Sequence, residues 1–141
     1  MLIDLRNALC RLLATSYERD HRVIVSGDYL SFNRKIGEQD NSIYVDVCTS
    51  AFEATEEGKQ TSTTLITFDI RVSHRILGEE CINDMLTFTE TLFRWFRGKK
   101  IDKYTVVSRQ WPVVDRSAVT SDVFSAVLST QFRVQEVFHA A

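Results

Sequence analysis

Three histidines are the side chains most able to serve as catalytic bases or metal ligands, and they lie far apart in the sequence, at His21, His74 and His139. None has a second ligand type at the three- or four-residue spacing that helical metal motifs use. A surface or strand-edge position explains an isolated histidine better than a ligand role does. We therefore predict no metal and no cofactor.

The acidic pairs Glu56-Glu57 and Glu79-Glu80 are the next candidates, because two carboxyl groups can act as acid and base. Neighbouring residues point apart on a helix or a strand, so a solvated loop and a helix start explain the pairs better. The sequence has no nucleophile elbow and no phosphate-binding glycine pattern, and it holds only 5 glycines. We predict that the protein is not an enzyme.

Composition points to one ordinary domain over residues 1–141, with a net charge of −2 and 44% hydrophobic residues. These values argue against a disordered chain and against a strongly basic nucleic-acid binder. No run reaches the roughly 18 apolar residues that a membrane span needs, so we expect folding in a cytoplasm. Cys10, Cys48 and Cys81 are odd in number and widely spaced, which predicts free core thiols.

Two amphipathic helices are expected, over 2–17 and 79–97. The second has the stronger pattern, with Glu79 and Glu80 at its start, basic residues at its end and Gly98 as a left-handed cap. We place Leu86 at the centre of its buried face. The apolar residues of that face are Ile82, Met85, Leu86, Leu92, Phe93 and Phe96.

Alternating segments predict the strands of an α+β fold with a mixed, mostly antiparallel sheet. Residues 43–52 and 64–75 should pair as a long hairpin with one solvated face. Residues 123–138 should form a long final strand. Shorter strands are expected at 23–25, 29–32 and 103–109, with a loop at 33–41 and an exposed apolar corner at 111–114.

The segment Glu53–Thr63 between the hairpin strands has no large apolar side chain, so we expect a solvent-exposed tip that is free to contact another molecule. Trp95 and Trp111 are large enough to anchor an interface, although either could lie in the core. The basic and aromatic run 94–100 could contact nucleic acid, but a helix end explains it better. The predicted assembly residues are Glu53, Thr55, Glu56, Glu57, Lys59, Trp95 and Trp111.

The order of these elements resembles the tail terminator proteins of long-tailed bacteriophages and the related tail-completion and head-tail connector proteins. The resemblance covers the leucine-rich first helix, the hairpin of 43–52 with 64–75, the helix 81–97 and the strand 124–134. It implies a mixed sheet flanked by helices and a homo-hexameric ring, with the tail tube protein and head-tail connector proteins as partners. It also implies a structural role in the virion after assembly in the host cytoplasm, and no specific nucleic-acid sequence or membrane.

Two other classes of function stay open. One is a small cytoplasmic ligand-binding or enzymatic domain with a pocket lined by aromatic residues, and the other is an adaptor or chaperone. Particle mass separates the first from a ring, because a hexamer weighs about six times the 16.2 kDa of one chain. The pocket residues would be Phe68, Phe93, Phe124 and Phe132.

Overall fold

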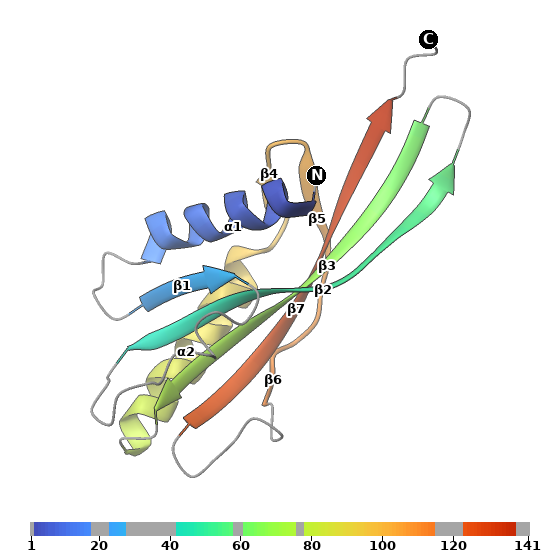
Figure 1. The fold of residues 1–141 in the computed structure, drawn as a ribbon. Coiled ribbons are helices and arrows are strands. Elements are labelled where there is room, and N and C mark those ends of the chain that lie inside the picture. Colours follow the sequence, from blue (N-terminus) through green and yellow to red (C-terminus); the bar gives the residue numbers. More distant parts are fainter. Residues whose placement is uncertain are drawn as a thin grey trace.

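The structure is a computed structural model that describes residues 2–17, 23–27, 42–57, 61–75, 78–114 and 123–137. Two helices pack on one face of a single sheet, which confirms the α+β fold (Figure 1). The elements in chain order are α1 (Leu2–Tyr17), β1 (Val23–Gly27), β2 (Ile43–Glu57), β3 (Thr61–Arg75), α2 (Glu79–Trp95), β4 (Lys100–Ile101), β5 (Tyr104–Arg109), β6 (Val113–Val114) and β7 (Val123–Val137).

The strand order in the sheet is β1-β2-β3-β7-β5-β4, and β6 pairs with β7. β1 runs parallel to β2, and the other described pairs are antiparallel. The predicted hairpin of β2 and β3 and the long last strand are therefore confirmed. The strand predicted at 29–32 and the loop at 33–41 lie outside the described residues.

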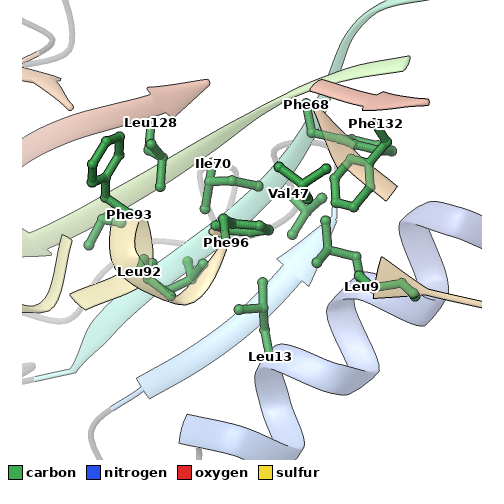
Figure 2. Packing of buried hydrophobic residues seen from close by; sticks show 14 of the residues in the cluster. Leu9, Leu13, Val47, Phe68, Ile70, Leu92, Phe93, Phe96, Leu128 and Phe132 are labelled. Carbon is green, nitrogen blue, oxygen red and sulfur yellow. The ribbon is translucent and has the colours of Figure 1, made fainter. Parts of the chain in front are cut away.

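Helix α1 has the predicted bounds and buries Leu5, Leu9 and Leu13, which recur every four residues and so share one face. Helix α2 also forms as predicted, and Gly98 adopts a left-handed φ of 59° just beyond it. In Figure 2, Leu9, Leu13, Leu92 and Phe96 lie opposite apolar side chains of the sheet. Both helices thus bury one face against the same layer.

The predicted position of Leu86 is wrong, because its side chain is 40% exposed. The buried line of α2 runs through Cys81, Met85, Thr89 and Leu92 instead. Thr89 can occupy this line because its hydroxyl donates a hydrogen bond of 2.7 Å to the backbone oxygen of Met85. A prediction that considers only apolar residues leaves out such a threonine. The predicted buried face was therefore turned about the helix axis toward Leu86.

The inward faces of β3 and β7 are those predicted from alternation, and they build the core with the helices. The opposite face departs from prediction, because β2 is buried there too, at Tyr44, Asp46 and Cys48. The Ser26 hydroxyl donates a hydrogen bond of 2.6 Å to the Asp46 carboxylate. Alternation identifies the residues that share a face, but it does not tell whether the second face is covered.

Candidate assembly surfaces

The most distinctive feature of the molecule is a three-stranded arm made by residues 53–57 of β2, 61–65 of β3 and 133–137 of β7. In Figure 1 these strand ends continue past both helices, at the upper right. The two ladders hold them together, since Glu53 pairs with Leu65 and Thr61 pairs with Val137. The arm is therefore a continuation of the central sheet.

This arm corrects the prediction of a loop tip at Glu53–Thr63. Strand pairing extends to Glu57 and Ser62, and Thr55 lies at a register shift between Ala54 and Glu56. Lys59 lies outside the described residues. Threonine favours strands through its β-branched side chain, but this polar sequence lacks the apolar alternation by which strands are found.

The β2 side of the arm is an open strand edge. β1 pairs with β2 only between Ile43 and Val47, and no other described strand lies on that side. Ser50 has no partner in the ladder, because the register shifts between Thr49 and Ala51. An edge of this kind presents unpaired backbone groups to a partner chain.

Phe52 lies at the base of the arm, and its side chain is 67% exposed. Its cross-strand neighbour Ile66 is 1% exposed, so at this level of the sheet burial ends between β3 and the edge strand β2. Sequence reasoning missed Phe52 as a contact residue. The one available signal was its position as the last large apolar residue before a polar segment.

Trp111 lies on the surface, 70% exposed, as the predicted apolar corner requires. Its ring stacks on that of Phe93, with centroids 4.3 Å apart and planes 20° from parallel. The Arg109 guanidinium lies 4.0 Å from the centre of the Phe93 ring and donates a hydrogen bond to the Phe93 backbone oxygen. Trp111 is thus held in place while most of its surface faces solvent.

Trp95 is half-buried and takes part in the packing between helices. Its ring centroid lies 6.3 Å from that of Tyr17 and 4.8 Å from that of Phe96, and the Lys99 ammonium lies 4.1 Å from it. Burial raises the pKa of Tyr17. Trp95 therefore stabilises the packing of α2, whereas Trp111 covers Phe93 of α2 from the surface. The predicted assembly residues are not brought together in one patch.

The basic run 94–100, at the end of α2, does not form a single basic cluster, because its side chains make different contacts. Arg94 forms an ion pair of 2.7 Å with Glu90 one helical turn earlier. Arg97 and Lys100 are exposed and make no ion pair within the described ranges. Phe93 and Phe96 enter the core, as the interpretation of this run as a helix end requires.

His74 corrects the prediction of a surface or strand-edge histidine, because it is fully buried on the helix side of β3. Its Nδ1 lies 2.5 Å from the Arg75 backbone oxygen, which can only accept, so Nδ1 carries the hydrogen. Nε2 has no hydrogen-bond partner in the described part of the chain. His21 and His139 lie outside it.

The described residues contain no group of three or more His, Cys, Asp or Glu side chains that could hold a metal ion. None of the three cysteines forms a disulfide, and Cys48 and Cys81 are buried while Cys10 is half-buried. None of the described helices is long and apolar enough to cross a membrane.

The four phenylalanines of the alternative pocket belong to the core or pack against it. Phe68 and Phe132 meet edge to face, with centroids 6.0 Å apart, and Phe96 contacts Phe132 in the same way at 6.3 Å. Edge-to-face packing of this kind is common between aromatic rings in protein cores. These rings therefore stabilise the contact between the sheet and α2.

Comparisons with known proteins add little to this description. No family model matches the chain, and no curated protein matches it. Among the solved structures that match is one whose name states no function, and the match covers 97% of this chain and 95% of that one with 13% sequence identity and a TM-score of 0.49. The fold assignment therefore depends on the helices and strands described above.

Proposed function

We propose that this protein is a structural subunit that caps the tail tube of a long-tailed bacteriophage and joins the tail to the head, working as a homo-hexameric ring. The observation that carries the proposal is the arm, together with the similarity in element order noted from the sequence. The partners are further copies of the chain, the tail tube protein and the head-tail connector proteins.

The arm supports this proposal because, among its described side chains, only Val134 belongs to the buried core. Ordering each backbone residue costs about 1–2 kcal/mol, and the arm sequence from Glu53 to Leu65 offers little apolar surface to offset that cost. A two-residue turn could join β2 and β3 closer to the helices. A polar strand extension is instead suited to contact a neighbouring molecule, through backbone groups at its edges and through charged side chains.

A ring of identical subunits also needs two different surfaces on each subunit, since every copy contacts one neighbour on each side. Beyond Val47, where its pairing with β1 ends, β2 is the edge strand on one side of the described sheet, and β4 is the edge strand on the other side. The exposed side chains of Phe52 and Trp111 lie near these two sides. This arrangement suits head-to-tail association.

The first test is particle mass. Light scattering coupled to size exclusion should find particles of about six times 16.2 kDa, either for the protein alone or after addition of purified tail tubes. Negative-stain images should show rings, with one ring at an end of each tube. A protein that stays monomeric and leaves the tubes bare would contradict the proposal.

The second test removes the arm. Replacing Thr55–Thr63 with Asn-Gly keeps the Ala54–Thr64 pair and closes the hairpin with a two-residue turn. The monomer should stay folded, because both helices and the sheet up to the Ala54–Thr64 pair are kept, and the new turn closes the hairpin there. Rings and tube capping should be lost. The matched control replaces only Gly58–Gln60 with Asn-Gly, keeps every described pair and should still assemble.

A further inference from the structure

The charged residues of the sheet are separated between its two edges at the level of the arm. Residues 52–57 on the β2 edge include three glutamates and no basic residue. Residues 97–103, around the β4 edge, include four basic residues and one acid. The whole chain has a net charge of only −2, so this separation is local.

The registers place one acid and one base from these edges in a single row across the sheet. Glu53 pairs with Leu65, and Leu65 pairs with Arg133. Arg133 pairs with Thr105, and Thr105 pairs with Lys100. Directly paired residues point to the same face of a sheet, so Glu53 and Lys100 lie on the same face, at the two ends of this row. Their strands are four strand spacings apart, or roughly 19 Å.

Both ends of this row are open within the described residues. β4 is the last strand in the order on its side, and the β2 edge has no strand partner beyond Val47. Glu53 and Lys100 are exposed, and neither forms an ion pair with a described residue. Each edge thus presents an exposed charge and has no described strand paired with it at that level.

We infer that the acidic β2 edge of one copy joins the basic β4 edge of the next copy, so that Glu53 lies beside Lys100 of its neighbour and the sheet continues from subunit to subunit. β2 and β4 are separated by four antiparallel pairings, so they run in the same direction and the new pair is parallel. The two edges differ, so the contact is head-to-tail and can close into a ring. This inference rests on the proposed function.

The test reverses each charge separately. Glu53→Lys and Lys100→Glu place like charges side by side at every interface, and each variant alone should lose its rings. An exposed pair contributes modestly, so we expect a loss of about threefold per interface. In a closed ring that factor is multiplied over all interfaces, so the fraction of protein in rings should fall at least tenfold at a concentration where the wild type is half assembled.

The decisive experiment mixes the two variants. Glu53→Lys subunits carry lysine at both positions and Lys100→Glu subunits carry glutamate at both, so an equal mixture should form rings in which they alternate. The double variant Glu53→Lys/Lys100→Glu should also form rings. Glu80→Lys and Arg11→Glu change exposed charges of the same types on the helices and should assemble like the wild type.

Thermal unfolding checks that each variant is folded before its assembly is scored. Rings of the folded single variants at the wild-type level would overturn the edge contact and leave the proposed ring intact. Failure of both the mixture and the double variant to regain rings would overturn it as well. A wild type that forms no ring, even with tail tubes, would overturn the proposed function and this inference together.

Discussion

The orientation of α2 is most sharply tested by a matched pair of substitutions, Leu92→Ala and Leu86→Ala. Leu92 is fully buried, and removing its side chain should leave a cavity that costs about 3–4 kcal/mol of the unfolding free energy. Leu86 is 40% exposed, so only about 60% of a burial energy of about 1.5–3 kcal/mol is at stake. No closed cavity forms at the surface, and alanine favours the helix slightly more, so we expect a loss of about 1 kcal/mol.

Urea unfolding followed by circular dichroism measures both values, provided the slope of the unfolding free energy against urea is unchanged. Both substitutions remove the same atoms from the same helix, so differences in helix propensity cancel. The expected difference of about 2–3 kcal/mol is well above the error of the method. Equal losses, or a larger loss for Leu86→Ala, would mean that α2 is rotated about its axis relative to the structure described here.

His74→Ala should cost about 2 kcal/mol or more, because it empties a buried site and removes the donor to the Arg75 backbone oxygen, and the metal content of the purified protein should not change. A loss within 0.5 kcal/mol, as is usual for surface sites, would refute the buried position. Trp111→Ala should lower the unfolding free energy by no more than about 1.5 kcal/mol, the contribution of one aromatic stack. Trp95→Ala should lower it by about 2–3 kcal/mol. The reverse order in urea unfolding would contradict the packing described for α2.

Much of the fold follows from periodicity. The bounds of α1 and the inward faces of β3 and β7 could be predicted, because a buried helix face and a half-buried strand each leave a regular apolar pattern. Gly98 could be predicted as a helix cap for a local reason, since glycine adopts a positive φ without strain. These features depend on residues close together in the sequence.

The errors share a different cause, because each involves polar residues at buried or paired positions, which an apolar pattern leaves out. Alternation with Val72 places His74 on the inward face of β3, but its polar side chain led to the prediction of a surface or strand-edge position. The strand ends beyond Phe52 are polar on both faces, so nothing in the pattern distinguishes a paired strand from a loop. For the same reason, the arm can be recognised only from the structure, in which this end of β2 pairs with β3, and β3 pairs with β7.

The row from Glu53 to Lys100 depends on one extra residue in β2. If Ser50 were paired, the ladder would place Phe52 opposite Leu65 and move Glu53 to the other face of the sheet. The bulge at Ser50 instead puts Glu53 on the face away from the helices, at the open edge, and leaves Phe52 across from Ile66. A bulge has no reliable signature in a single sequence, so the charge of this edge could be predicted while its alignment with Lys100 could not. Alternation alone puts Phe52 and Glu53 on opposite faces of β2, and the bulge decides which face each side chain takes: Phe52 lies on the helix side, and Glu53 lies on the other side in the row with Lys100.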